Sequence, residues 1–244
     1  TYEDLANYKA VIRQPAHGIY RGFDVYSMSP PSSGGVHIVQ ILNMLEHYPV
    51  TEYGHNSART LHLMAEAMRR AYADRARYLG DTDFIKVPLQ GLTSKSYATE
   101  LVSTIQLDKA TPSVEIKAGN PLQYESPETT HFSIVDQYGN AVSNTYTLNF
   151  SYGSGIVVAG AGFLLNNEMD DFSTKSGTAN AFGLIGGEVN KVEANKRMLS
   201  SMSPTIVKQA GKNFLVTGSP GGSRIISTTL QVIMNVIDHK LNIQ

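Results

Sequence analysis

Residues 129–148 read TTHFSIVDQYGNAVSNTYTL, and this stretch decides the fold class. Residues rich in Thr, Val, Phe and Tyr lie on both sides of a short polar segment, DQYGN, at 136–140. β-Branched and aromatic residues favour strands, and Asp, Gly and Asn favour the turns that connect them. The pattern therefore predicts a β-hairpin with strands over 129–135 and 141–148.

Residues 107–128, LDKATPSVEIKAGNPLQYESPE, come directly before this hairpin. They are polar, include three prolines and show no helical or strand period, which is typical of an exposed, mobile linker. A linker that ends on a threonine at the start of a strand suits self-cleavage. The Thr129 hydroxyl would attack the Glu128 carbonyl, and the freed α-amine, with an unperturbed pKa of about 7.7–8.0, would serve as the base. The plainer alternative is that Thr129 is only a strand residue, because Thr favours strands.

Apolar periodicity predicts further helices and strands on both sides of the linker. Breaker residues separate them, including PPSSGG at 30–35 and a Gly/Ser-rich loop over 173–187. Helices are expected over 36–45, from Asn56 or Ser57 to a stop at Gly80, over 96–105 and after Gly222. Strands are expected as a pair within 10–29 and at 156–159, 205–207 and 214–217.

Composition excludes several classes of function. The formal net charge is -1, so no strong field attracts nucleic acid or an acidic membrane. No cysteine is present, which removes disulfides, thiolate catalysis and cysteine-bound metal. The sequence contains no G-x-S-x-G elbow, H-E-x-x-H zinc motif or P-loop lysine motif. Both ends are expected to be cuts inside a longer protein, because no initiator Met or leader precedes Thr1.

Two short motifs carry candidate groups for acyl transfer. GSPGGS at 218–223 lies between a predicted strand and the last helix, where the amides of Gly221 and Gly222 could hold negative charge as an oxyanion hole. A tight turn, or a phosphate loop without its lysine, would also explain this motif. Ser200 and Ser201 in NKRMLSSMSP offer adjacent hydroxyls to a carboxylate, but they could equally cap a turn.

Carboxylates gather in a third motif, NNEMDD at 166–171, which follows an apolar run. Such a group suits a substrate ammonium. A solvated turn is the plain alternative, and a calcium loop is disfavoured because the EF-hand ligand spacing is absent. The histidines are scattered and give no support to a Ser-His-Asp or zinc site: His62 is interpreted as a packed or surface residue, and His131 as a residue that packs or hydrogen-bonds in the hairpin.

These segments together resemble the γ-glutamyltranspeptidases, a family of amino-terminal-nucleophile hydrolases. The resemblance covers nearly the whole chain and rests on PPSSGGVHIVQILNMLE, HLMAEAMRRAYADRARYLGD, TTHFSIVDQYGNAVSNTYTLN, GFLLNNEMDDFS, NKRMLSSMSPTIV and GSPGGSRIISTTLQVI. It implies an α+β fold, the four-layer αββα sandwich with two central antiparallel sheets, which this chain would build only in part. It also implies that residues 1–128 end a large subunit and that residues 129–244 form most of a small subunit.

The resemblance implies a role for each candidate residue. Thr129 would form the γ-glutamyl ester after a cut between Glu128 and Thr129, and Thr147 would hydrogen-bond its hydroxyl. The implied reaction is ping-pong acyl transfer from glutathione and related γ-glutamyl amides to water, an amino acid or a peptide, with neither metal nor organic cofactor. The other implied roles are the oxyanion hole for Gly221 and Gly222, the substrate α-amino group for Asn149, Glu168 and Asp171, and the substrate α-carboxylate for Ser200 and Ser201.

The chain departs from the family pattern in a few places. The family arginine that clamps the substrate α-carboxylate comes from an earlier part of the large subunit, and Arg69 and Arg70 are expected to be structural instead. Phe182 stands where the lid loop usually carries Tyr. Since Phe cannot donate a hydrogen bond toward Asn149, a more loosely latched lid is expected. Met198 replaces a common Pro beside the serines, with a minor expected effect.

Other functions were weighed against γ-glutamyl transfer. An acylase of the same fold that acts on another amide, such as a β-lactam side chain, is the nearest alternative, although Ser200, Ser201 and Asp171 favour an amino-acid substrate. An inactive, uncleaved homologue that only binds ligand is another. A nucleotide-binding protein lacks its lysine and its acidic Mg²⁺ partner. The resemblance further implies a heterodimer of the two subunits after cleavage, no nucleic-acid partner, and a periplasmic or extracellular location.

Overall fold

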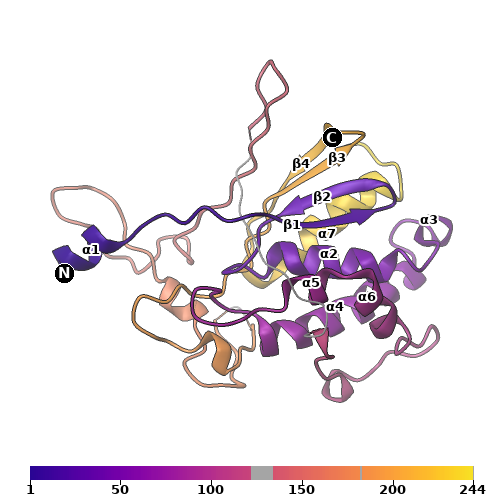
Figure 1. Cartoon of the computed structure of the whole chain (residues 1–244), viewed down its shortest axis with the longest axis horizontal. Helices are drawn as coiled ribbons and strands as arrows, with labels where there is room; N and C mark the ends of the chain where they lie inside the picture. Colours follow the sequence, from indigo (N-terminus) through magenta and orange to yellow (C-terminus); the bar gives the residue numbers. More distant parts are fainter. Residues whose placement is uncertain (122–133, 182, 244) are drawn as a thin grey trace.

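The computed structural model describes residues 1–121, 134–181 and 183–243. Within these ranges the central sheet has four antiparallel strands in the order β1-β2-β3-β4 (Figure 1). The sheet joins two hairpins that lie far apart in the sequence. The strands are β1 (Ala16–Tyr20), β2 (Phe23–Ser27), β3 (Thr205–Gln209) and β4 (Lys212–Thr217).

Each hairpin closes through a two-residue turn with positive φ at both residues. These are Arg21 and Gly22, with φ of 48° and 82°, and Ala210 and Gly211, with φ of 49° and 78°. Positive φ at both central positions is the type I′ geometry, whose twist matches that of the flanking strands. The turns therefore set the register of β1 on β2 and of β3 on β4.

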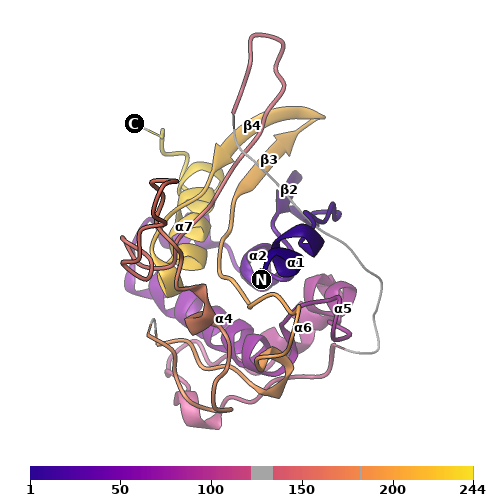
Figure 2. The ribbon, with the colours of Figure 1, turned by 90° about the vertical axis from the view of Figure 1, so that its left-hand side faces the viewer.

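Two helices, α2 (Gly34–Leu45) and α7 (Ile225–Ile237), pack side by side against the sheet, as both views show (Figures 1 and 2). Every residue of α2 is buried, and the helix contacts β1, β2, α4, α5, α6 and α7. Burying one large apolar side chain stabilises the fold by about 1.5–3 kcal/mol. The main core lies here, and its fully buried side chains include Tyr20, Ile38, Ile41, Leu42, Leu45 and Ile226.

A second helical layer lies behind α2. Its long helix is α4 (Ala58–Tyr78), which begins where the Ser57 side chain accepts a hydrogen bond from the Thr60 amide. No helix in the described part of the chain combines the length and apolar character needed to cross a membrane. The shorter elements are α1 (Tyr2–Asn7), α3 (Val50–Tyr53), α5 (Leu89–Thr93), α6 (Lys95–Val102) and the 3-10 turns η1 (Ser113–Glu115), η3 (Glu168–Asp171), η4 (Glu188–Asn190) and η5 (Gly222–Arg224).

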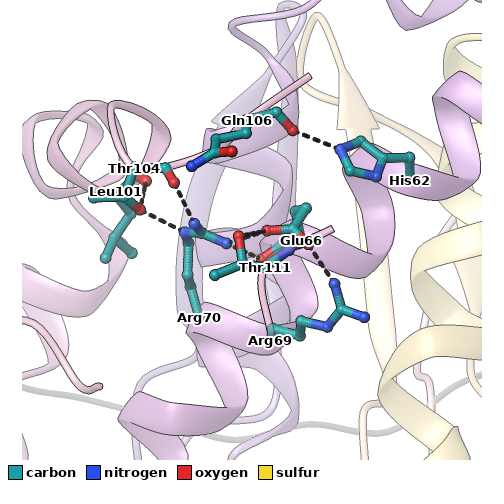
Figure 3. A network of polar contacts seen from close by, with 8 residues as sticks. All are labelled: His62, Glu66, Arg69, Arg70, Leu101, Thr104, Gln106 and Thr111. Atoms are coloured by element: carbon teal, nitrogen blue, oxygen red, sulfur yellow. Dashed lines mark hydrogen bonds and ion pairs between the residues drawn. The ribbon is translucent and has the colours of Figure 1, made fainter. Parts of the chain in front are cut away.

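A buried carboxylate on α4 ties this helix to the segment after α6 (Figure 3). Glu66 has a fully buried side chain and pairs with Arg69 and Arg70. It also accepts hydrogen bonds from the Thr111 amide at 3.0 Å and hydroxyl at 2.7 Å. Arg70 in turn donates to the Thr104 hydroxyl at 2.7 Å. Both arginines are therefore held within the scaffold, as the sequence predicts.

The linker is held near its described end by α4. Asp74 accepts a hydrogen bond from the Gly119 amide at 3.0 Å, and the Tyr78 hydroxyl donates to the Gly119 carbonyl at 2.7 Å. Asp74 is buried and also accepts from Tyr97 at 2.9 Å and Gln40 at 2.6 Å. The hydrogen bonds of Asp74 and Tyr78 to Gly119 thus anchor a segment that is otherwise irregular and mostly exposed.

The predicted hairpin is only partly formed. Its described part, 134–148, contains an antiparallel bridge between Val135 and Ala141 and a turn in which Asp136 accepts from the Asn140 amide at 3.0 Å. No regular strand follows, so the predicted return strand is wrong, and the first residues of the hairpin lie outside the described ranges. Two strands alone are marginally stable in water. This ribbon projects beyond the sheet and forms no strand of it, although Ser143 donates to the Thr217 carbonyl at 2.8 Å and accepts from the Thr205 amide at 3.2 Å (Figure 1).

The remaining predictions mostly hold. The strand pair near the start, β3, β4 and the helices α2, α4, α6 and α7 form where apolar periodicity predicts them, although α6 ends at Val102. The strand predicted at 156–159 is wrong, because only a single bridge joins Val157 to Leu164. The short helices α3 and α5 were not predicted, since elements of about one turn show no full apolar period. Helix α1 begins at a capping box between Thr1 and Asp4, which the Thr-Tyr-Glu-Asp sequence of residues 1–4 resembles.

We expect Glu66→Gln to lower the free energy of unfolding of the complete protein by about 3 kcal/mol at pH 7, because two arginines lose their buried partner. Burial alone would raise the pKa of Glu66, but hydrogen bonds from Thr111 and Arg70 outweigh it and lower the pKa to about 2. The stabilising contribution is therefore present above the usual pKa of 4.5 and is lost as the pH falls toward 2. Urea unfolding followed by circular dichroism at pH 7 and pH 3 measures both effects.

Glu100→Gln is the matched control, because Glu100 is exposed on α6. It should change the free energy of unfolding by less than about 0.5 kcal/mol at either pH. A loss in Glu66→Gln that is the same at pH 3 and pH 7 would show that the ionised carboxylate is not what holds α4.

Candidate active site

A pocket of about 550 Å³ lies at the N-terminal end of α7. Its walls come from segments that are far apart in the sequence, among them 145–151, 200–202 and 220–222. Glu168 is not part of the lining, and Glu128, Thr129 and Phe182 lie outside the described residues. The sequence-predicted residues that line the pocket are Thr147, Asn149, Asp171, Ser200, Ser201, Gly221 and Gly222.

The serine pair is held by the breaker cluster that precedes α2. Ser200 forms a parallel bridge with Ser32, and its backbone exchanges hydrogen bonds with the Pro31 carbonyl at 2.8 Å and the Ser33 amide at 2.9 Å. The Ser33 hydroxyl also donates to the Ser200 carbonyl at 3.0 Å. Ser201 is only 6% exposed. The two hydroxyls therefore sit on a rigid segment rather than on a free loop.

The glycine motif forms a tight turn into α7. Gly221 and Gly222 have φ of 128° and 56°, a region that glycine adopts without steric cost. The Arg224 amide closes the turn on the Gly221 carbonyl at 3.0 Å, and α7 begins at Ile225. Free backbone amides and the helix dipole make the start of a helix favourable for negative charge. The turn therefore lines the pocket with the start of a helix, which favours negative charge.

The carboxylates are placed by the turn η3 at 168–171. Burial raises the pKa of Asp171 to about 6, while the nearby Arg75 guanidinium and a hydrogen bond from Asn180 at 3.1 Å oppose this rise. Burial also raises the pKa of Glu168, and the charge of Asp171 adds to the effect. A poorly solvated carboxylate gains strongly from a cation. Asp171 can therefore bind an ammonium group that enters the pocket.

Thr147 and Asn149 are linked on the opposite wall. The Asn149 amide donates to the Thr147 hydroxyl oxygen at 2.8 Å, and φ of Asn149 is 76°. Its side-chain amide donates to the Asn167 carbonyl at 3.2 Å, next to η3. Short polar side chains tolerate this left-handed conformation better than most residues. The local turn thus joins the ribbon to the carboxylate motif.

Sequence reasoning missed Arg75, which is 4% exposed behind the serine pair. Its Nε donates to the Ser33 hydroxyl at 2.9 Å and its Nη2 to the Ser201 hydroxyl at 3.2 Å. Burial lowers the pKa of Arg75 to about 10, so the side chain stays positive at neutral pH. One signal was present in the sequence: Ala67, Ala71 and Arg75 recur every four residues along the buried face of α4.

The site combines hydroxyl donors, a partly buried carboxylate and an amide turn, a set that suits an amino-acid group beside a reacting carbonyl. Within the described ranges, no group of three or more His, Asp or Glu side chains is arranged to hold a metal ion.

Comparison with known proteins gives consistent matches. A family model described as Gamma-glutamyltranspeptidase matches residues 1–244. The Glutathione hydrolase proenzyme of Escherichia coli (strain K12) is 60% identical over 243 residues, which cover 100% of this chain and 42% of that protein. The protein of the same name from Pseudomonas sp. (strain A14) is 52% identical over 244 residues, again covering 100% of this chain and 42% of the relative. The chain therefore spans well under half the length of these relatives.

A solved structure supports the fold. The cephalosporin acylase from Bacillus halodurans superposes with a TM-score of 0.81 at 26% identity, covering 100% of this chain and 41% of that one. The chain accordingly has the α+β architecture of the amino-terminal-nucleophile hydrolases, of which the described residues build one antiparallel sheet and the helices packed on it.

We expect Asp171→Asn to stabilise the ligand-free complete protein at pH 8 by about 1–3 kcal/mol. The folded pKa of Asp171, about 6, is raised from the usual 3.8. Stability that depends on this group is therefore fully present below pH 3.8 and is lost as the pH rises through 6. Thermal unfolding at pH 4 and pH 8 should show a gain in the variant only at pH 8.

Asp108→Asn removes an exposed carboxylate on the linker and serves as the matched control. It should leave the melting temperature unchanged at both pH values. A loss of stability in Asp171→Asn at pH 8 would mean that the ionised carboxylate supports the fold instead of being held at a cost for a ligand.

Proposed function

The chain belongs to the γ-glutamyltranspeptidase family, and we propose that it is the part of such an enzyme that spans the self-cleavage site and forms most of the γ-glutamyl pocket. Its proposed activity is transfer of a γ-glutamyl group from glutathione and related amides to water, an amino acid or a peptide. Two of its relatives are named glutathione hydrolase proenzymes, which supports a precursor that is cut.

The observation that carries this proposal is the convergence of separate motifs on one pocket. Ser200 and Ser201 offer hydroxyls, Asp171 offers a partly buried carboxylate, and Gly221 and Gly222 offer amides at the start of α7. An α-carboxylate and an α-ammonium on one carbon need complementary partners side by side, and the pocket provides both kinds. The glutamyl side chain would then extend toward the glycine turn, where its γ-carbonyl would react.

In the proposed reaction, the α-amine of the cut chain takes the proton of the Thr129 hydroxyl as its Oγ bonds to the γ-carbonyl carbon. Gly221 and Gly222 hold the oxyanion. When the intermediate collapses, the carbon–nitrogen bond breaks and the departing amine takes the proton, which leaves a γ-glutamyl ester. Water or an acceptor amine then attacks the ester carbon, and the hydroxyl of Thr129 is restored.

Thr147 would orient the nucleophile. Its hydroxyl oxygen already accepts the Asn149 amide at 2.8 Å, so its proton is available to another acceptor. We propose that this acceptor is the Thr129 hydroxyl. Glu168 does not line the pocket. Because it stands on the same turn as Asp171, we propose that it lies near the substrate α-amino group.

The nearest alternative is an acylase of the same fold. It is favoured by the likeness to the cephalosporin acylase from Bacillus halodurans. The serine pair and Asp171 together favour a substrate with an amino-acid end. Parallel assays with a γ-glutamyl anilide and a glutaryl anilide, which lacks only the α-amino group, separate the two activities. We further propose that the cut parts remain paired as a heterodimer in the periplasm or outside the cell, as expected for the family.

Thr129→Ala tests self-processing and the nucleophile together. Denaturing intact mass with amino-terminal sequencing should find two fragments in the wild-type complete protein, one of which begins at Thr129. The variant should remain one uncut chain and lose at least about 10⁴-fold in hydrolysis of a γ-glutamyl anilide.

The Ser133→Ala variant, which changes another hydroxyl of the predicted hairpin, serves as the matched control and should still be cut. A folded wild-type protein that stays uncut would lack the free amine and would favour the inactive, ligand-binding alternative.

The lid prediction is tested with Phe182→Tyr. A tyrosine hydroxyl could donate to Asn149 and latch the lid, so we expect the ratio of transfer to hydrolysis to rise by about twofold or more because water enters less freely. Product analysis with and without an acceptor dipeptide measures the ratio, and Phe182→Leu controls for loss of the ring. An unchanged ratio in Phe182→Tyr would show that the lid does not depend on this hydroxyl.

A further inference from the structure

Arg75 is a buried cation without a carboxylate bonded to it among the described residues. Its guanidinium binds hydroxyl oxygens instead, those of Ser33 and Ser201. The carboxylate with the strongest electrostatic effect on Arg75 is that of Asp171, which lines the same pocket as Ser201. Taking a guanidinium out of water without an ion-pair partner is costly. Arg75 does not itself line this pocket, but Ser201, to which it donates, does, so the guanidinium charge favours an anion bound at Ser201.

The direction of the hydrogen bonds supports this interpretation. A guanidinium only donates, so the Ser201 hydroxyl must accept from Arg75, and its own proton remains free to be donated. Ser200 is arranged in the same way, because its hydroxyl oxygen accepts from the Met202 amide at 3.1 Å. Both hydroxyls therefore have an acceptor position filled from inside the protein. The next group they meet in the pocket should be an acceptor, as a carboxylate is.

We infer that Arg75 is a positioning residue for the substrate α-carboxylate: it fixes Ser201 as a hydrogen-bond donor and places a buried positive charge behind the serine pair. This role rests on the proposed function and adds to it a residue on α4. The same guanidinium opposes the rise in the pKa of Asp171. Arg75 thus supports both binding groups for an amino-acid zwitterion, the hydroxyls for the carboxylate and the ionised Asp171 for the ammonium.

A purely structural role is the competing explanation, because Arg75 also links α4 to Ser33 at the start of α2. The two roles differ in what they predict for a substrate without an α-carboxylate. A structural defect should lower activity on every substrate alike. A positioning role should weaken only those substrates that carry the carboxylate.

The test uses the complete protein and a pair of p-nitroanilides, that of the glutamate γ-carboxyl and that of 4-aminobutanoate, which lacks only the α-carboxylate. Arg75→Gln should raise KM for the glutamyl substrate by about 10- to 100-fold and change kcat by less than about threefold. Its kcat/KM for the 4-aminobutanoyl substrate should fall by less than about threefold. Arg75→Lys keeps the charge and should restore part of the lost affinity.

A double-mutant cycle with Ser201→Ala locates the effect. In the Ser201→Ala background, Arg75→Gln should raise log KM for the glutamyl substrate by less than about a third of the amount by which it raises log KM in the wild-type background. Arg77→Gln makes the same change at an exposed site on α4 and should alter neither KM. Equal losses on both substrates, or fully additive losses in the cycle, would overturn the inference and leave Arg75 a structural residue.

Two further measurements keep the outcome clear. If Arg75→Gln does not fold or is not cut, Arg75→Lys and Ser33→Ala, which removes one anchor of the guanidinium, should still show the selective rise in KM, and a lack of it would overturn the inference. If the wild type does not act on the glutamyl anilide, the proposed function fails by itself. Calorimetry with L-glutamate then tests Arg75 directly: weaker binding by Arg75→Lys than by wild type supports it, and equal binding or none overturns it.

Discussion

The pairing of β2 with β3 is the contact on which the rest of the molecule depends. In this pair Val25 lies opposite Val207, and both side chains are fully buried. A shift of one residue would turn every side chain of a strand to the other face, so a buried pair of this kind fixes the register. Beyond these strands the same two segments meet again in a parallel bridge, where the Ser33 amide donates to the Ser200 carbonyl. The pocket is therefore assembled across two parts of the chain that the proposed cut would separate.

Three hydroxyl groups of the pocket share the same hydrogen-bonding arrangement. Each of three hydroxyl oxygens, those of Thr147, Ser200 and Ser201, accepts a bond from the scaffold. A hydroxyl that accepts from one side is left to donate on the other. The scaffold thus presents the site as a set of donors together with one partly buried carboxylate, that of Asp171, and it does so before any ligand is bound. Such preorganisation reduces the reordering that binding requires.

Much of the fold and part of the site could be predicted from the sequence, for reasons that differ by element. The helices α2, α4 and α7 show apolar periods long enough to read, and the GSPGGS turn shows its glycines. The prediction of a return strand over 141–148 was wrong because a strand also needs a neighbouring strand to pair with, and the residue pattern does not specify that partner. Arg75 was missed although its spacing from Ala67 and Ala71 places it on the buried face of α4, because that spacing does not show what this face contacts. Only the packing of α4 against the serine segment turns it toward the pocket.

The hydrogen bonds that hold Gly119 limit how far the end produced by the proposed cut could move from α4. Asp74 and Tyr78 hold this residue from both sides. From Pro121, the last described residue of the linker, to Glu128 the chain can extend by at most about 25 Å. The proposed cut after Glu128 would therefore leave the new carboxylate tethered to α4 and within this reach of it. The group that departs in this first reaction would stay attached to the large part of the protein, and external substrates would meet the nucleophile only after this end has moved aside.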